Sequence, residues 1–470
     1  MIPFSGREGL AFPALFSIIR GETQGGAVGP AQSIPYIQKG SLDMKAPVTF
    51  AIAGFGDRGS TYASMQKLFP EKMKVVAVAD LDPRKVEKAR QLYDIPQENC
   101  FSSAEEMLEQ EKLADVMVVS TMDRQHVGHA IPALRKGYNI LMEKPISPEL
   151  DKCKEILEVA KDCPGKIIVC HVLRYTTFYN KLKELISSGR IGDVVSICAN
   201  ENVGYWHQAH SFVRGNWRNS QETSPMILQK SCHDMDILTW LLGKKCKAVS
   251  SFGSTRLFKP ECAPEGAALR CLDGCKAKEK CLFDAEKIYI TSPKTGLATG
   301  SSWMSSVLSV ENTMESTYKA LREGPYGRCV YHCDNDVVDH QQVNLLMEDG
   351  STISFTMCAF TESCYRYFKA MGTQGEIEAD MLSNIIHVRE FGKEEETIDV
   401  GKLSSDLKGH GGGDSGIIQD FLEMLLNDAE PNERTTTLEH SMESHFIALA
   451  AEESRLHGGQ VVDLEAFKQR

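Results

Sequence analysis

The stretch VTFAIAGFGDRG, residues 48–59, decides the fold of this chain. Six residues typical of a buried strand lead into Gly54, Gly56 and Gly59, and a helical pattern follows. In this arrangement the first glycine permits a tight turn, the second lets backbone approach a pyrophosphate, and the third lets helix and strand pack closely. The N-terminus of the helix adds backbone donors and a positive dipole end. The stretch therefore predicts a dinucleotide-binding βαβ unit.

An acidic residue ends the next predicted strand. Asp80 lies 21 residues after Gly59, where a carboxylate can accept hydrogen bonds from both hydroxyls of an adenosine ribose. At about 4 Å that carboxylate repels a 2′-phosphate by roughly 1 kcal/mol per unit charge in water, and by about 4 kcal/mol at an intermediate dielectric. Asp80 therefore predicts NAD as the cofactor. Arg84 leaves NADP open, because its guanidinium can offset the repulsion.

Strand and helix patterns alternate along the first third of the chain, which is typical of a parallel sheet with crossover helices. We predict an α/β protein with a Rossmann domain at residues 44–165 and a C-terminal α+β domain at residues 166–470, where the loops lengthen and strands of period two appear. Residues 259–287 are rich in Cys, Gly, Pro and charge and predict an inserted loop. Residues 416–456 predict terminal helices.

The first residues of the chain differ from the rest. Met44 stands just before the first predicted strand, so residues 1–43 are interpreted as an extension outside the fold. Residues 10–19 are apolar, which leaves a secretory signal peptide as the alternative.

Composition excludes several classes of function. The 470 residues include 52 Lys and Arg against 64 Asp and Glu, a formal net charge of −12, whereas nucleic acids and anionic membranes bind basic faces. We therefore expect a small-molecule partner, with no nucleic acid and no membrane. No uninterrupted apolar run in the sequence reaches the roughly 18 to 20 residues of a membrane span. Fifteen cysteines are sparse and odd in number, which predicts free or metal-bound thiols and a cytoplasmic location.

Three sequence segments together resemble the Gfo/Idh/MocA family of glucose-fructose oxidoreductase and inositol dehydrogenase-like enzymes. They are GFGDRG, VAVADLDPRK and the 30 residues from Val116 to Pro145, which end in the motif EKP. The resemblance extends from Met44 to the C-terminus. It implies a Rossmann domain, a second domain with an open and largely antiparallel sheet that often forms oligomer contacts, and substrates that are mostly sugars and cyclitols. We therefore expect a homo-oligomer.

The resemblance also implies roles for residues at the strand ends. Thr121 and His126 match a cofactor loop of the family, although Met122 replaces its usual proline. Glu143 and Lys144 match residues that line nicotinamide and substrate, and a lysine there can stabilise a developing alkoxide or move its proton. The expected cofactor-binding set is Gly54, Phe55, Gly56, Asp57, Arg58, Gly59, Asp80, Arg84, Ser120, Thr121, His126, Glu143 and Lys144.

A second motif, QKSCHDMDIL at residues 229–238, resembles a helix of the family that carries the catalytic histidine. His233 matches that histidine and Asp236 the acid one turn later. Many relatives have aspartate where Gln229 stands, and glutamine cannot transfer a proton. Lys230 lies three residues before His233 on nearly the same helical face and is our candidate replacement.

Polar and aromatic residues between these motifs suit a ring substrate. Arg174 and Tyr175 resemble a strand-end pair of the family, and residues 205–218 interleave aromatic faces with fork-like donors. An oligomer contact is the alternative for this loop. The glycine loop at residues 410–414 resembles one that leads into the C-terminal helices of relatives. The expected substrate-binding set is Arg174, Tyr175, Tyr205, His207, His210, Arg214, Trp217, Arg218, Gln229 and His233.

Four cysteines stand within twenty residues of the predicted insertion. Cys262, Cys271, Cys275 and Cys281 are spaced Cx8C, Cx3C and Cx5C, and four thiolates fit a closed tetrahedral zinc site. An iron–sulfur cluster is a second interpretation. Cys329 or Cys333 is an alternative fourth ligand in place of Cys262, and free thiols remain open.

These features lead to one main hypothesis and two rivals. The main hypothesis is an NAD-dependent oxidoreductase that acts on a ring hydroxyl of a pyranoside or cyclitol, with Lys144, His233 and Lys230 handling the proton. The first rival is an NAD-dependent glycosidase on the same scaffold, which oxidises C3 transiently, eliminates the substituent, adds water and reduces again. The second rival, a dinucleotide-sensing binding module, is weaker because Lys144 and His233 are both present.

Overall fold

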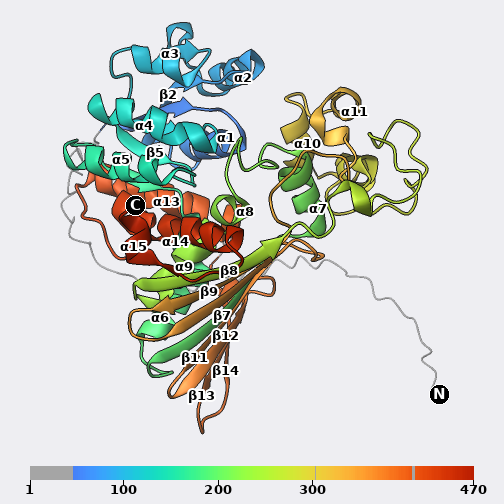
Figure 1. Cartoon of the computed structure of the whole chain (residues 1–470). Coiled ribbons are helices and arrows are strands. Elements are labelled where there is room, and N and C mark those ends of the chain that lie inside the picture. The colour runs from blue at the N-terminus through green and yellow to red at the C-terminus, as the bar shows by residue number, and fades with distance from the viewer. Residues whose placement is uncertain (1–45, 302, 405–407) are drawn as a thin grey trace, which may run out of the picture. The chain divides into compact units, whose positions relative to one another are not determined.

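The computed structural model describes residues 46–301, 303–404 and 408–470, which form one compact unit from Ala46 onward. The predicted extension, residues 1–43, lies outside the described residues. Figure 1 shows a mixed α/β chain in which a first sheet with flanking helices precedes a larger second sheet. None of the helices in these three ranges has the length and apolar content needed to span a bilayer.

The first sheet has six parallel strands in the order β3-β2-β1-β4-β5-β6. This is the strand order of a Rossmann fold, as predicted. Its central strands are almost wholly buried and apolar because helices cover both faces of the sheet. The strands are β1 Val48–Ala53, β2 Met73–Ala79, β3 Cys100–Phe101, β4 Val116–Val119, β5 Asn139–Met142 and β6 Ile167–Val169.

The helices between these strands begin at residues that suit a helix N-terminus. Asp82 caps α2 by accepting a hydrogen bond from the backbone of Arg84, and Pro83 occupies the first turn, where its missing N–H costs nothing. The helices are α1 Asp57–Ser64, α2 Pro83–Tyr93, α3 Ala104–Glu109, α4 His126–Arg135 and α5 Leu150–Lys161.

The second sheet has nine strands in the order β14-β13-β12-β11-β7-β10-β9-β8-β15. Only the pair β7 and β10 is parallel, so the predicted open and largely antiparallel sheet is confirmed. Its strands alternate buried and exposed residues, which leaves one face outside the core. The strands are β7 Val194–Asn202, β8 Cys246–Ser254, β9 His340–Met347, β10 Thr352–Cys358, β11 Tyr365–Gly372, β12 Gly375–Asp380, β13 Ile385–Glu390, β14 Glu396–Asp399 and β15 Val462–Asp463.

C-terminal segments return to the first sheet. The apolar side of α13 packs in one core with β1 and β4, and Val169 of β6 donates its backbone N–H to the carbonyl of Thr436. In Figure 1, α9 and α14 lie against the second sheet near β8. The remaining helices are α6 Thr177–Ser187, α7 Tyr205–His207, α8 Met226–Gln229, α9 Cys232–Leu242, α10 Trp303–Leu308, α11 Met314–Glu323, α12 Lys408–Gly411, α13 Gly413–Leu426, α14 Leu438–Leu456 and α15 Leu464–Lys468.

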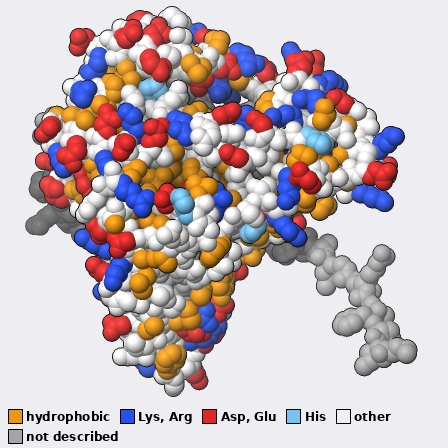
Figure 2. All heavy atoms as spheres, in the orientation of Figure 1, with side chains coloured by type: hydrophobic (Ala, Val, Ile, Leu, Met, Phe, Trp, Pro, Cys, Tyr) orange, Lys and Arg blue, Asp and Glu red, His pale blue; other side chains and the backbone are white. Residues whose placement is uncertain are grey.

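A third, smaller hydrophobic core lies apart from the two main ones. It gathers the π-helical segment Gln208–Arg214, the predicted insertion and the segment around Tyr331. The insertion contains a short helical turn at Pro260–Cys262, an isolated bridge at Arg270 and the start of the π-helical segment Lys287–Thr291, and is otherwise irregular, as its composition predicted. Acidic and basic side chains are interspersed over the face of the molecule that Figure 2 shows.

Candidate active site

The glycine loop between β1 and α1 has space at one glycine and none at the other two. A Cβ on Gly54 would lie 2.5 Å from the carbonyl oxygen of Ser120, and a Cβ on Gly59 would lie 1.9 Å from that of Gly54. A Cβ on Gly56, the residue that precedes α1, would meet no described atom within 4 Å. The missing side chain therefore leaves the N-terminal amides of α1 accessible. This cradle fits the pyrophosphate of a dinucleotide.

Asp80 follows β2 and is held against the glycine loop. Its carboxylate accepts hydrogen bonds from the backbone N–H groups of Phe55, at 2.8 Å, and Asp82, at 2.9 Å. Arg84 does not reach Asp80 but forms a fork with the carboxylate of Asp82 and also contacts Glu311. The carboxylate of Asp80 thus lies where a ribose is expected to bind. Arg84, the residue that could have accommodated the phosphate of NADP, is already paired with other carboxylates.

The loop after β4 joins the cofactor side to the EKP motif. Ser120 donates its hydroxyl to the carbonyl of Gly54, which ties this loop to the glycine turn. The two ring nitrogens of His126 lie 2.7 Å from the carbonyl oxygen of Pro145 and 3.1 Å from that of Thr121. His126 therefore fixes the spacing of two loops and is a positioning residue.

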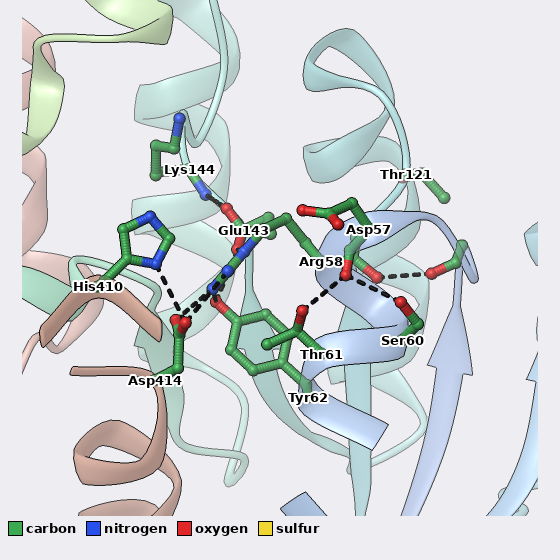
Figure 3. Close-up of polar contacts among 12 residues, drawn as sticks. Asp57, Arg58, Ser60, Thr61, Tyr62, Thr121, Glu143, Lys144, His410 and Asp414 are labelled. Atoms are coloured by element: carbon green, nitrogen blue, oxygen red, sulfur yellow. Dashed lines mark hydrogen bonds and ion pairs between the residues drawn. The ribbon is translucent and has the colours of Figure 1, made fainter. Parts of the chain in front are cut away.

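A buried polar network joins α1, the EKP motif and α13 (Figure 3). Arg58 donates to the carboxylate of Glu143 at 2.8 Å, to the hydroxyl of Tyr62 at 2.5 Å and to the carboxylate of Asp414 at 2.6 Å. Tyr62 donates to Glu143 at 2.6 Å, and the Nδ1 atom of His410 lies 3.1 Å from Asp414. Arg58, predicted to bind the cofactor, instead ties these three segments together.

Opposite charges keep the acids of this network ionised. Burial opposes ionisation of Glu143, but the charges of Arg58 and Lys144 hold the pKa of Glu143 below its usual value. Burial likewise opposes ionisation of Asp414, yet His410 and Arg58 hold its pKa far below the usual range. Both carboxylates are therefore anions at neutral pH, and neither is available as a general acid.

Lys144 lies just after β5, and His233 lies on α9. The ammonium group of Lys144 donates to the backbone carbonyl oxygen of Gln229 at 2.7 Å, directly before the segment that leads into α9. His233 is 8% exposed and its Nδ1 atom has no hydrogen-bond partner. Burial, and next the charge of Lys144, hold the pKa of His233 well below its usual value. The imidazole of His233 is therefore neutral, and the charge of Lys144 acts on it.

A second buried histidine, His171, was missed by the sequence analysis. Its ring lies edge to face with that of His233 at 5.6 Å and with that of His445 at 5.5 Å. Both of its nitrogens lack partners, and burial holds its pKa well below the usual value. The available signal was its position just after β6, at the carboxyl edge of a parallel sheet, where ligands of such folds bind.

Lys230 and Gln229 take different places from those expected. The ammonium group of Lys230 lies 3.2 Å from the carboxylate of Glu201 on β7, which also pairs with Arg366. Arg366 makes a further pair with Asp234 at 2.6 Å. The expectation that Lys230 replaces the missing aspartate beside His233 is therefore not supported. Gln229 acts through its backbone carbonyl, which positions Lys144.

Arg174 and Tyr175 are part of the interior. The guanidinium of Arg174 binds the carboxylate of Asp236 through two hydrogen bonds of 2.7 Å, and both residues are under 5% exposed. Tyr175 packs in the core and its hydroxyl contacts that of Thr436 at 3.1 Å. Both groups have protein partners, so we withdraw them from the substrate-binding set.

The aromatic loop divides into two parts. His207 stacks on Trp206, with ring centroids 5.7 Å apart, and meets the edge of Trp303 at 5.4 Å. Burial lowers the pKa of His207 well below its usual value, and the charges of Lys230, His210 and Lys144 lower it further. Tyr205 instead turns its ring toward Phe283 of the third core.

The second part of the loop packs against aromatic residues of the third core. His210 contacts the hydroxyl of Tyr289 through Nδ1 at 3.1 Å and stacks on Tyr326. Arg214 is fully buried and donates to the carbonyl oxygens of Phe283 and Arg328. His210 and Arg214 thus have protein partners, and neither is included in the substrate site proposed below.

Trp217 and Arg218 are also committed to protein partners. The indole N–H of Trp217 donates to Asp123 at 3.1 Å, beside the cofactor loop. Arg218 makes a two-point ion pair with Asp334 at 2.8 and 2.9 Å. They hold the loop in place, and their groups are not free for a substrate.

The cysteine prediction needs one change of ligand. Cys262 turns its thiol to the carbonyl of Arg256, whereas Cys271, Cys275, Cys281 and Cys329 line one cavity. All fifteen cysteines are free. Within the described ranges, no three His, Cys, Asp or Glu side chains stand close enough together, as positioned, to hold a metal ion.

Both domains match one protein family. Residues 48–171 match the Gfo/Idh/MocA family model described as "Oxidoreductase family, NAD-binding Rossmann fold". Residues 183–464 match the model of the second domain, described as "Oxidoreductase family, C-terminal alpha/beta domain". The chain therefore belongs to the Gfo/Idh/MocA oxidoreductase family, as the sequence motifs indicated. It is an NAD-dependent enzyme of this family that binds NAD through its Rossmann domain.

Individual relatives are distant. The putative oxidoreductase YteT of Bacillus subtilis is 25% identical over 377 residues, which cover 76% of this chain and 84% of YteT. The 2,7-anhydro-N-acetylneuraminate hydratase of Escherichia coli is 24% identical over 44% of this chain, but the match spans only 52% of the hydratase. The crystal structure of an inositol dehydrogenase homologue with NAD+ from Azotobacter vinelandii superimposes with a TM-score of 0.64 at 13% identity, covering 91% of this chain and 100% of that one.

Proposed function

We propose that this enzyme oxidises a ring hydroxyl of a sugar or cyclitol with NAD as the hydride acceptor. The observation that carries the proposal is that the ammonium group of Lys144, just after β5, is fixed on the carbonyl of Gln229, four residues before the buried His233, whose Nδ1 atom has no partner in the described structure. Removal of hydride from an alcohol carbon requires the hydroxyl proton to leave as well. A cation and an uncharged base suit that task.

Each group has a separate part in handling the hydroxyl. The glycine loop and Asp80 would hold NAD, which would supply the hydride acceptor. The ammonium group of Lys144 stabilises negative charge on the oxygen, and its bond to the carbonyl of Gln229 fixes its direction. His233, whose Nδ1 atom has no partner in the described structure, takes the proton. The network around Glu143 holds the backbone of Lys144 through a 3.1 Å hydrogen bond.

The surroundings of this pair support a polar ring substrate. His207, stacked on Trp206 and set against Trp303, offers an aromatic wall beside donors and acceptors. The A. vinelandii structure carries the name of an inositol dehydrogenase homologue, which is consistent with a cyclitol or a sugar here. Substrate binding is thereby assigned to His207, Lys144 and His233 rather than to the buried arginines.

The exposed face of the second sheet supports the expected homo-oligomer. Phe252 of β8 and Leu346 of β9 are 58% and 40% exposed on strands whose alternate residues are buried. Exposed apolar side chains on an open sheet suit burial by a second copy. Light scattering coupled to gel filtration tests this; a monomer at micromolar concentration contradicts it.

The test is stoichiometric NADH formation. Purified enzyme with NAD and a panel of unsubstituted sugars and cyclitols is expected to produce one NADH per substrate oxidised. Lys144→Ala should lower kcat about 100- to 10,000-fold while NAD affinity changes only a few fold, because the lost group acts on the transition state. Lys161→Ala, at an exposed lysine of α5, is the matched control. Full turnover by the Lys144 variant would remove this residue from the mechanism.

A redox-neutral glycosidase is the second candidate, and one observation favours it. His171, with two unpartnered nitrogens beside His233, provides a second neutral base. Elimination next to a transient ketone needs a base for the adjacent carbon in addition to a group for the hydroxyl. The E. coli relative is named a hydratase. Cleavage of an aryl glycoside without net NADH, lost when NAD is stripped and restored when it is added, would select this candidate over the first.

A further inference from the structure

A small cavity lies in the third hydrophobic core, away from Lys144 and His233. Its volume is about 10 Å³, and thiol groups from four cysteines line it: Cys271, Cys275, Cys281 and Cys329. This volume is about that of one water-sized sphere, which is room for a single ion.

Backbone pairing brings the fourth cysteine to the other three. The segments around Arg270 and Arg328 form an antiparallel bridge. Cys271 donates its backbone N–H to Gly327 at 3.0 Å, and Cys329 donates to Leu269 at 2.9 Å. Two segments far apart in sequence are thus locked side by side, with a cysteine on each.

The remaining cysteines lie on a turn that closes over the same cavity. Lys276, next to Cys275, donates its backbone N–H to Gly266 at 3.0 Å, and Cys281 donates to Ala277 at 3.0 Å. All four cysteines therefore line one space from short, irregular segments.

A buried cation at the cavity lacks a counter-ion. Arg214 is 0% exposed, its Nη2 atom lies 3.5 Å from the sulfur of Cys271, and its Nη1 atom has no hydrogen-bond partner. Among the described residues, no carboxylate is paired with Arg214. Asp284, which also lines the cavity, accepts a hydrogen bond from the backbone of Lys287 instead. Because a buried, unpaired charge is costly, the site calls for negative charge near the guanidinium.

We propose that Cys271, Cys275, Cys281 and Cys329 bind one Zn²⁺ ion as four thiolates. A tetrahedral Zn(Cys)₄ site, with Zn–S distances of about 2.3 Å, is closed and carries a net charge of −2. That charge supplies the missing counter-ion of Arg214. Because the described thiols as positioned form no metal cluster, binding requires cysteine side chains to change rotamer. Binding releases the four thiol protons and involves no redox step.

The ion would stabilise the third core rather than take part in the reaction. Arg214 ends the π-helical segment Gln208–Arg214, and this segment starts next to His207. Zinc binding therefore fixes the far end of the loop whose near end faces the proposed active site. This inference does not depend on which substrate the enzyme oxidises.

The test is metal content measured by mass spectrometry on full-length enzyme purified under reducing conditions without chelator. About one zinc per chain is expected in the wild type and in Cys262→Ser and Cys333→Ser, two matched controls whose thiols are absent from the cavity lining. Cys271→Ser and Cys329→Ser should retain less than about a fifth of an equivalent. Zinc loss in Cys262→Ser equal to that in Cys271→Ser would overturn this ligand set.

A second measurement applies if the variants do not fold. Titration of wild-type enzyme with a mercurial thiol reagent should release one zinc, read with a colorimetric chelator, as four thiols react. Protein that holds no zinc after expression in zinc-supplemented medium would contradict the proposal. Iron with acid-labile sulfide in place of zinc would overturn it in favour of a cluster.

Discussion

The nucleotide side and the proposed substrate side of this site are built by different means. On the nucleotide side, Gly54 and Gly59 fit because their backbones touch carbonyl groups that leave no room for a Cβ. On the substrate side, buried ion pairs such as Arg174 with Asp236 fix α9 and the strands beside it. The glycines meet backbone carbonyl groups, of Ser120 for Gly54 and of Gly54 for Gly59, whereas the ion pairs join charged side chains 62 or more residues apart. The two sides should therefore respond differently to mutation.

The largest effect is expected from Arg174→Ala on the substrate side. The change leaves the carboxylate of Asp236 buried without its partner, which typically lowers the free energy of unfolding by about 3–5 kcal/mol. Urea unfolding of the variant measures this. A double change to leucine, at Arg174 and Asp236, should recover most of the loss because no buried charge remains.

A matched surface pair serves as the control. Arg218→Ala breaks the pair with Asp334, whose carboxylate is half exposed, so a loss of about 0–1 kcal/mol is expected. If Arg174→Ala instead left stability unchanged and raised KM, the residue would bind substrate, as its sequence context suggested.

Two glycine variants test how the nucleotide side is built. In Gly59→Ala the new Cβ would lie 1.9 Å from a carbonyl oxygen, so we expect a stability loss of about 1–3 kcal/mol. Gly56 has a φ of −76° and open space, so Gly56→Ala should fold with unchanged or slightly higher stability. The added methyl group would nevertheless weaken NAD binding about tenfold, because it occupies the approach to the pyrophosphate. Calorimetry and NAD titration separate the two effects; equal loss of stability in both variants would contradict this account.

These differences explain what could be predicted from sequence. The glycine spacing, the position of Asp80 and the EKP motif are local patterns with one structural solution, and the structure has each of them where they were expected. A buried arginine has no such signature. Arg174 and Arg214 look like substrate ligands in sequence because their partners, Asp236 and the carbonyl of Phe283, lie far along the chain.

Arg58 and His171 also differ from the sequence-based expectation because their contacts come from distant parts of the chain. Arg58 lies inside the nucleotide motif, yet its strongest contacts are with Glu143 and with Asp414, which is 356 residues away. His171 carries no motif and becomes visible only when folding places it between His233 and His445. The nature of the fold followed from periodicity, whereas the charged interior of the second domain required the tertiary structure.

The buried histidines predict loss of stability at acid pH. Burial holds the pKa of His171 and His233 well below the usual 6.5, and lowers that of His445 to about 3. In the unfolded chain these groups take up protons near pH 6.5, but in the folded protein they stay neutral to lower pH. Their contribution is complete above pH 6.5 and is lost as the pH falls toward the folded values, by up to about 1.4 kcal/mol per pH unit for each histidine.

Urea midpoints measured between pH 7.5 and 5 test this slope. His171→Phe should reduce the slope of unfolding free energy against pH by up to the equivalent of one proton, because one buried histidine is removed. His457→Gln, at an exposed histidine, is the control and should change the slope much less. The same reasoning places the acid limb of kcat/KM below pH 6.5, because His233 must be neutral to accept a proton. A limb centred above pH 6.5 would show that another group is the base.

The smallest effect concerns the choice between NAD and NADP. In Asp80→Ala the enzyme loses the carboxylate that stands against a 2′-phosphate, so the preference for NAD should fall about five- to tenfold, equivalent to roughly 1 kcal/mol. Asp80 also accepts the backbone N–H of Phe55, so NAD itself should bind somewhat less tightly. Asp80→Asn separates the two causes, because its amide oxygen can still accept that N–H while the charge is gone. If Asp80→Asn keeps the wild-type preference for NAD, charge repulsion is not the basis of the selectivity, and the fork of Arg84 with Asp82 becomes the next place to look.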